Sequence, residues 1–135
     1  MVIDASVTIA AVADEVHTAR AREILRTVAR EGAVVPGVWP IEVANILLMM
    51  ERRGLIDSDT RTRIAEQLEA LPITIDPETA GRALGRISEL AARHRLSVYD
   101  GCYLELSLRL GEPLATFDTA LARAAKDAGV EVVSV

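Results

Sequence analysis

Four acidic side chains stand where apolar segments meet turns or helix starts. Asp4 ends the segment MVID, Glu42 follows WPI, Asp100 precedes the apolar run GCYLELSLRL, and Asp118 follows PLATF. Asp and Glu rarely lie beside a core unless they are paired or bind metal. Carboxylates at close range repel one another, so a shared site requires a cation. Oxygen ligands favour Mg²⁺ or Mn²⁺, and such an ion suits phosphodiester hydrolysis.

Two hydroxyl side chains lie close to these acids in the sequence. Ser6 is two positions after Asp4, and Thr116 is two positions before Asp118. Hydroxyls so placed could orient a carboxylate or a bound water without touching the metal themselves. We therefore predict that Ser6 and Thr116 support the site.

Helix starts offer the competing interpretation of the same acids. Asp4, Asp100 and Asp118 could act as N-caps, and Glu42 could complement a helix dipole. Three other acids also begin helices and are interpreted as caps only: Asp57, Asp59 and Asp76.

Short apolar runs alternate with helical periodicity along the chain. Strands are predicted at residues 2–3, 33–35, 73–75, 114–116 and 130–133. Helices are predicted at residues 7–13, 17–31, 41–53, 59–71, 78–94 and 119–128. Ser6 is expected to cap the first of these helices and Ser58 the helix at 59–71, and Asp100 opens a further helix. This order predicts one α/β domain over residues 1–135, an α/β/α sandwich with a central, mainly parallel sheet. Asp4, Glu42 and Asp118 are then expected at the carboxyl edge of the sheet, where ligands bind in such folds.

Composition restricts the class of protein. The chain has 135 residues, a net charge of −5 and one cysteine, Cys102, so no internal disulfide can form. This fits a reducing cytoplasm, and neither a signal peptide nor an apolar run long enough to span a bilayer is expected. The negative charge argues against a nucleic-acid partner. That argument loses its force if four of the acids bind metal.

The basic side chains are almost all arginine, and Lys126 is the sole lysine. Arginine suits bidentate contacts to phosphate, although codon bias explains the same composition. Arg20, Arg22 and Arg26 lie on the predicted helix 17–31. They form either a solvated helix face or part of an RNA path.

The chain resembles the PIN domain family, and more narrowly the VapC-type toxins of bacterial toxin–antitoxin pairs. The segments that carry the resemblance are VIDASV, WPIEVANIL, SVYDGCYLELSLRLG and LATFDTALARAAKDAGVEVV, in that order. Together they contain all four acids and cover nearly the whole chain.

The resemblance implies a Mg²⁺- or Mn²⁺-dependent ribonuclease with Asp4, Glu42, Asp100 and Asp118 as catalytic acids. It implies metal binding by Asp4, Asp100 and Asp118, a homodimer, and inhibition by a VapB-type antitoxin. It also places Asp100 at the shared edge and Asn45, one turn after Glu42, within reach of the site. Some PIN nucleases carry a further acid shortly after the fourth; here Thr119 follows Asp118, so one firm metal is expected.

Other functions remain open from the sequence alone. A receiver-like phosphorylation domain needs a lysine near the last strands, but Lys126 lies inside the last predicted helix. A phosphatase of the haloacid-dehalogenase type needs a second Asp two residues after Asp4, where Ser6 stands. A solitary RNA-processing nuclease and an inactive PIN domain that only binds are the remaining alternatives.

Overall fold

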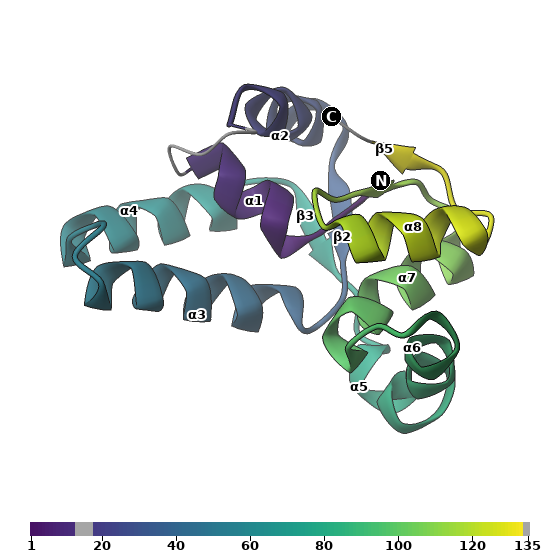
Figure 1. The fold of residues 1–135 in the computed structure, drawn as a ribbon. Coiled ribbons are helices and arrows are strands. Elements are labelled where there is room, and N and C mark those ends of the chain that lie inside the picture. Colours follow the sequence, from purple (N-terminus) through teal and green to yellow (C-terminus); the bar gives the residue numbers. More distant parts are fainter. Residues whose placement is uncertain (13–17, 134–135) are drawn as a thin grey trace.

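The computed structural model describes residues 1–12 and 18–133. A five-stranded sheet lies at its centre, with the strand order β3-β2-β1-β4-β5 and parallel pairing throughout (Figure 1). The strands are β1 (Val2–Ile3), β2 (Ala33–Val35), β3 (Ile73–Ile75), β4 (Leu114–Ala115) and β5 (Val132–Val133). The predicted α/β/α sandwich with a parallel sheet is confirmed.

The central strand β1 shows why these short segments form a sheet. Val2 and Ile3 are fully buried, and Val2 pairs with Val34 on one side and Leu114 on the other. Strands covered on both faces need continuous apolar sequence rather than alternation. All strands run the same way, so Asp4 after β1 and Asp118 after β4 leave the sheet at the same edge.

Helices surround the sheet and connect its strands. They are α1 (Ala5–Val12), α2 (Thr18–Glu31), α3 (Trp39–Arg52), α4 (Ser58–Glu69), α5 (Thr79–Arg82), the π-helix η1 (Ala83–Ile87), α6 (Ser88–His94), α7 (Val98–Leu110) and α8 (Thr119–Asp127). Helix α1 packs on α2 and α3, and α7 packs on β1, β4, α6 and η1. Helices α3 and α4 pack together and project to the left in Figure 1. None of the helices in the described ranges is long and apolar enough to cross a membrane.

The predicted helix at residues 78–94 is divided into α5, η1 and α6. The Ser88 hydroxyl donates a hydrogen bond of 2.6 Å to the Ala83 carbonyl oxygen, five residues earlier. Gly81 and Gly85 lower the helix propensity of this stretch, which makes a wider turn easier to accommodate. Residues 79–94 are thus helical without a gap, close to the predicted range, but the helix contains a π-helical segment that was not predicted.

Three predicted caps are wrong, because a neighbouring polar residue takes the role. Helix α1 begins at Ala5 and is capped by Asp4, not Ser6, since Val7 donates its backbone N–H to Asp4. Helix α4 is capped by Asp57, not Ser58, and α7 by Ser97, not Asp100. The interpretation of Asp118 as the cap of α8 is confirmed by a 2.8 Å hydrogen bond from the Leu121 backbone N–H.

Several element ends differ from the prediction by a few residues. Helix α3 starts at Trp39, α4 ends at Glu69 before the Leu71-Pro72 pair, β4 ends at Ala115 and β5 starts at Val132. A residue before proline disfavours helical geometry, which explains the early end of α4. The predicted end of the first helix at Ala13 and start of the second at His17 lie outside the described residues.

Candidate active site

Asp4 is a buried carboxylate held by three donors. It is 5% exposed, and its Oδ1 accepts hydrogen bonds from the Ser6 hydroxyl (2.6 Å) and the Val7 backbone N–H (3.0 Å). Its Oδ2 accepts a hydrogen bond from the Thr116 hydroxyl. Ser6 and Thr116 thus contact the acid that they were predicted to orient, and the rotation of this carboxylate is restricted.

The same two hydroxyls tie the end of β4 to Asp4. The Ser6 Oγ accepts the backbone N–H of Phe117 (3.0 Å), and the Thr116 Oγ1 accepts that of Asp118 (3.0 Å). This pattern fixes the turn that leads into α8. The exposed Asp118 therefore begins α8 beside Asp4, although the two are far apart in sequence.

Asp100 and Glu42 each lie in the first turn of a helix. Asp100 is half-buried in the first turn of α7, and its backbone N–H donates to the Ser97 hydroxyl (3.1 Å). Glu42 lies in the first turn of α3, and its Oε1 accepts a 2.7 Å hydrogen bond from the Tyr103 hydroxyl of α7. The second contact joins α3 to the helix that carries Asp100.

The pKa values of these acids show that they share one electrostatic environment. Burial, and then the negative charge of Asp118, raise the pKa of Asp100 from 3.8 to about 6, with further contributions from Glu42 and Asp4. Burial raises the pKa of Asp4, and Asp118 adds to the effect while the hydrogen bonds from Ser6, Thr116 and Val7 oppose it. Burial also raises the pKa of Glu42, with the Tyr103 hydrogen bond acting against it and Asp4 reinforcing it. The four acids are therefore close enough for the charge of one to act on another, and together they are called the acidic group.

The carboxylates suit a hard divalent cation in their chemistry. Asp4, Asp100 and Asp118 offer only oxygen ligands, and each carries charge that destabilises the ionised form of another. A cation removes that repulsion. In residues 1–12 and 18–133, no three potential ligand side chains are close enough to coordinate one ion as they stand. Asp4 is fixed by its donors, so Asp100 and Asp118 would turn toward it to share an ion.

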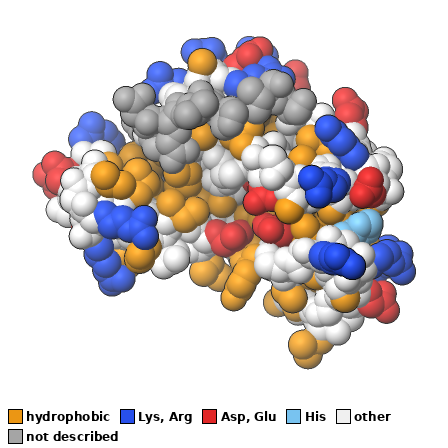
Figure 2. All heavy atoms as spheres, in the orientation of Figure 1, with side chains coloured by type: hydrophobic (Ala, Val, Ile, Leu, Met, Phe, Trp, Pro, Cys, Tyr) orange, Lys and Arg blue, Asp and Glu red, His pale blue; other side chains and the backbone are white. Residues whose placement is uncertain are grey.

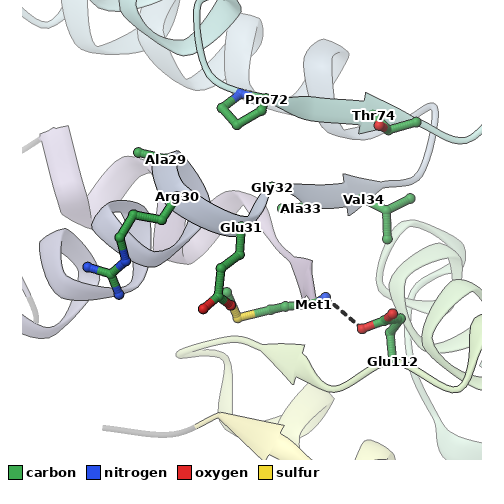
Figure 3. Close-up of a pocket in the computed structure, with 10 residues that line it drawn as sticks. All are labelled: Met1, Ala29, Arg30, Glu31, Gly32, Ala33, Val34, Pro72, Thr74 and Glu112. Atoms are coloured by element: carbon green, nitrogen blue, oxygen red, sulfur yellow. Dashed lines mark hydrogen bonds and ion pairs between the residues drawn. The ribbon is translucent and has the colours of Figure 1, made fainter.

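Figure 2 shows acidic side chains gathered at the middle of one face, with hydrophobic side chains directly below them. A hollow of about 570 Å³ lies elsewhere, beside Met1, Gly32 and Glu112 (Figure 3). These residues precede strands or follow α7, so the hollow is at the amino edge of the sheet. The ion pair between the Met1 amino group and Glu112 (2.7 Å) occupies part of its wall. This hollow is therefore separate from the acidic group.

Comparison with known proteins settles the family. The PIN domain family matches residues 1–127, which is nearly the whole chain. The chain belongs to the PIN domain family. This assignment confirms the resemblance predicted from the four acidic segments, and it argues against the receiver-like and phosphatase alternatives.

Individual PIN relatives are more distant. Ribonuclease VapC3 of Pyrobaculum aerophilum is 33% identical over 81 residues, which cover 60% of this chain and 62% of that protein. The chain therefore matches less than two thirds of the length of this curated relative. The similarity supports the narrower resemblance to VapC-type proteins.

Two crystal structures share the fold. PAE2754 from Pyrobaculum aerophilum has a TM-score of 0.71 and 22% identity, covering 98% of this chain and 82% of the other. FitAcB from Neisseria gonorrhoeae has a TM-score of 0.65 and 18% identity, covering 97% and 94%. At these identities the comparison shows the arrangement of elements alone.

Tyr103 is a residue of this PIN site that sequence reasoning missed. Its side chain is 1% exposed, and its hydroxyl contacts Glu42 from 61 positions away in the sequence. Burial raises its pKa, so the phenol stays protonated and remains a donor. The available signal was its position three residues after Asp100, on the same side of α7.

The remaining predicted site residues are Asn45 and three arginines of α2. Asn45 is exposed on α3, and its side chain forms no hydrogen bond with another described residue. Arg20 forms an ion pair with Glu23 (2.9 Å), and the Arg22 Nε donates to the Ala11 carbonyl oxygen (3.4 Å). Arg26 is exposed and lines a hollow of about 280 Å³ with Arg22. A role for these arginines in RNA contact stays a prediction.

Asp76 was interpreted as a helix cap, but the N-cap position of α5 is occupied by Glu78, and Asp76 has a different role. Its carboxylate forms an ion pair with Arg109 of α7 (2.7 Å) and accepts a hydrogen bond from the Thr79 hydroxyl (3.3 Å). The hydrogen bond from Arg109 lowers the pKa of Asp76 below its ordinary value. This acid is thus neutralised by a partner, unlike the four of the acidic group.

Proposed function

We propose that this chain is a metal-dependent endoribonuclease, the toxin of a VapBC-type pair. The observation that carries the proposal is the group of four acids, in which burial and the charges of neighbouring acids raise the pKa of Asp4, Glu42 and Asp100. Membership of the PIN family and the similarity to a ribonuclease of the VapC type support the same function.

The proposed metal ligands are Asp4, Asp100 and Asp118. When bound, Mg²⁺ or Mn²⁺ would polarise a phosphoryl oxygen of RNA and lower the pKa of a water. Asp4 is the rigid ligand because Ser6, Val7 and Thr116 hold its carboxylate. Thr119 follows Asp118 where a further acid would help to bind a second ion, so one firmly bound ion is proposed.

Glu42 has a different role in this proposal. Its Oε1 is engaged by Tyr103, which leaves Oε2 to accept a proton from the attacking water. The raised pKa of Glu42 brings its proton affinity closer to neutrality, as a general base requires. Water then attacks phosphorus in line, and the bond from phosphorus to the leaving oxygen breaks.

Partners form part of the same proposal. A VapB-type antitoxin and a second copy of the chain would need apolar surface, and several large apolar side chains are exposed: Ile41, Leu55, Leu84 and Tyr99. Exposed apolar side chains that gather into patches mark interaction surfaces. The proposed place of action is the cytoplasm. A neighbouring gene for a small DNA-binding protein would support the toxin role, and its absence would favour a solitary RNA-processing nuclease.

The test is cleavage of end-labelled single-stranded RNA with Mn²⁺ or Mg²⁺. We expect cleavage by the wild type, loss on adding EDTA, and at least a 100-fold slower reaction for Asp4→Ala and Asp100→Ala. Arg30→Gln, an exposed change on α2, serves as a control for handling and contamination. Undiminished cleavage by both Asp variants would refute the site.

A further inference from the structure

A basic hollow lies between the end of α6 and the outer face of α8. It has a volume of about 300 Å³, and its polar lining consists of Arg93, His94, Arg95 and Arg123, with Asp127 as the one acid. The whole chain carries a net charge of −5, so this concentration of positive charge contrasts with the rest of the molecule.

Among the residues that the structure describes, no acid forms an ion pair with the three arginines of this hollow. Five other arginines form ion pairs with acids: Arg20, Arg61, Arg82, Arg86 and Arg109. Within the described residues, no carboxylate lies within 4.0 Å of the guanidinium groups of Arg93, Arg95 or Arg123. Arg93, Arg95 and Arg123 are also exposed, so their charges are available to a ligand.

Arg95 adopts a backbone conformation that arginine rarely takes. Its φ is 57° and its ψ is 41°, and it ends α6 in the left-handed region. The other described residues with positive φ are the glycines 32, 54, 111 and 129. A side chain in this conformation costs on the order of 1 kcal/mol, and such strain clusters at functional sites. Glycine would relieve the strain, but it would remove the charge.

The hollow adjoins the acidic group through two chain segments. Arg95 is two residues before Ser97, the cap of the helix that carries Asp100. Ala120, which also lines the hollow, is two residues after Asp118. Figure 2 shows basic side chains and a histidine to the right of the central acidic side chains, on the side where α6 and α8 lie in Figure 1. A strand that leaves the acidic group in this direction meets the arginines next.

We propose that this hollow, built around Arg95 and Arg123, binds the phosphates of the single-stranded RNA that flanks the scissile bond. The inference rests on the proposed nuclease function and names a contact that the acids alone do not provide. Guanidinium groups match phosphate oxygens in a bidentate manner. The lining contains no Trp, Tyr or Phe, and His94 is its one aromatic ring. Because three guanidinium groups stand against one imidazole, the subsite is expected to hold the backbone and not to select sequence.

The test compares binding by wild type and by the double variant Arg95→Asn/Arg123→Gln. Asparagine tolerates the left-handed conformation, so Arg95→Asn removes the charge without breaking the helix end. The matched control is Arg30→Gln/Arg53→Gln, which removes two exposed charges from α2 and from the residue after α3. The probes are labelled oligo(U) and oligo(A), with fluorescence anisotropy read in EDTA so that binding is separate from cleavage.

We expect the double variant to bind both RNAs about tenfold more weakly, and the control to bind as the wild type does. The slope of log affinity against log salt should become less steep by about 1.4, since two phosphate contacts are lost at about 0.7 each. Thermal melting should show that both variants stay folded, and Arg123→Gln alone should give an intermediate loss.

Equal affinities of the double variant and the control would overturn the subsite while leaving the nuclease proposal intact. A loss confined to oligo(U) or to oligo(A) would also overturn it, because it would indicate base recognition. A wild type that neither binds nor cleaves RNA would instead refute the proposed function, and the subsite with it.

Discussion

At the scale of single residues, the acids differ in whether a cation neutralises them. Asp76 has Arg109 as its partner, whereas Asp100 forms no ion pair with a residue that the structure describes and its pKa is raised by the charges of Asp118, Glu42 and Asp4. The pKa of Asp76 is lowered and that of Asp100 is raised to about 6. The ionised form therefore stabilises the fold in the first case and destabilises it in the second.

Asp100→Asn should stabilise the metal-free protein at pH 7. The folded state binds more protons than the unfolded state between about pH 4 and pH 6, so the wild-type unfolding free energy falls as the pH rises through that window. The gain for Asp100→Asn at pH 7 should be about 1 kcal/mol, after allowing for solvent screening of this half-buried group. Thermal melting in EDTA at pH 4 and pH 7 measures it.

Asp76→Asn provides the opposite control for that experiment. It should lose about 1–2 kcal/mol, because the change removes the buried Asp76 carboxylate from Arg109, which keeps only its ion pairs with Glu105 and Glu78. Added Mn²⁺ should raise the melting temperature of wild type and of Asp76→Asn, and have little effect on Asp100→Asn. If Asp100→Asn and Asp76→Asn both lower the stability, the claim that neighbouring acids repel the ionised Asp100 carboxylate would be contradicted.

Tyr103→Phe should slow RNA cleavage about tenfold with a small change in stability. The substitution removes the donor to Glu42 Oε1 while the ring still fills its buried position; the loss of one hydrogen bond to a charged group is worth about 1.5–3 kcal/mol. Single-turnover cleavage rates at several pH values measure the effect, because the pKa of Glu42 should also change once it no longer accepts the Tyr103 hydrogen bond. Tyr99→Phe is the matched control, because Tyr99 is the other tyrosine and is 62% exposed.

At the scale of elements, α7 positions the centre of the site. Residues 101–107 are all buried, and the helix contacts β1, β4, η1 and α6. It carries Asp100 in its first turn and Tyr103 one turn later. A displacement of α7 would therefore move one proposed ligand and the support of a second acid together.

Gly101→Ala should displace the start of α7. A Cβ at this position would lie 3.2 Å from both the Ala91 Cβ and the Ile87 carbonyl oxygen. Both atoms belong to packed helices, so the substitution should cost about 1–3 kcal/mol and reduce cleavage. Chemical denaturation measures the cost. Gly81→Ala, where a Cβ meets nothing within 4 Å, should be neutral or stabilising by up to about 1 kcal/mol; equal effects would contradict this account of α7.

Sequence alone predicted the elements best where an acid follows an apolar strand. Asp4 and Asp118 could be placed at one edge because β1 and β4 are short, apolar and parallel. Asp100 has no strand directly before it, so its place depended on the family resemblance. Cap choices failed where two polar residues compete, as at Asp57 and Ser58. The π-helix is accompanied by a side-chain hydrogen bond from Ser88, and Tyr103 contacts a partner 61 positions away; no local pattern reveals either contact.

At the scale of the whole molecule, large apolar side chains remain exposed on the surface of the single chain. Leu84 of the π-helix is 98% exposed, and Ile41 is 70% exposed. π-helical turns often occur at functional positions. The proposed homodimer would give such side chains a partner, and the fold of one chain does not.

Leu84→Glu should convert the proposed dimer to a monomer without lowering the stability of the monomer. The side chain makes almost no contact within its own chain, so a polar replacement is harmless there and costly only in an interface. Light scattering after size exclusion measures the mass. Glu89→Gln, an exposed change in α6, is the surface control, and it is preferred to Arg86→Glu, which lies two positions after Leu84 in the same helix. A monomeric wild type, or a dimer that Leu84→Glu leaves unchanged, would contradict this role of Leu84.

The central claim is that Asp4, Asp100 and Asp118 share one divalent cation. The anomalous scattering of Mn²⁺ in crystals of this protein tests it most directly. We predict one fully occupied peak among these three carboxylates, and its loss in crystals of Asp100→Asn grown and soaked in the same way. Two fully occupied ions would contradict the single firm site, and no peak among the three acids at saturating Mn²⁺ would contradict the account itself.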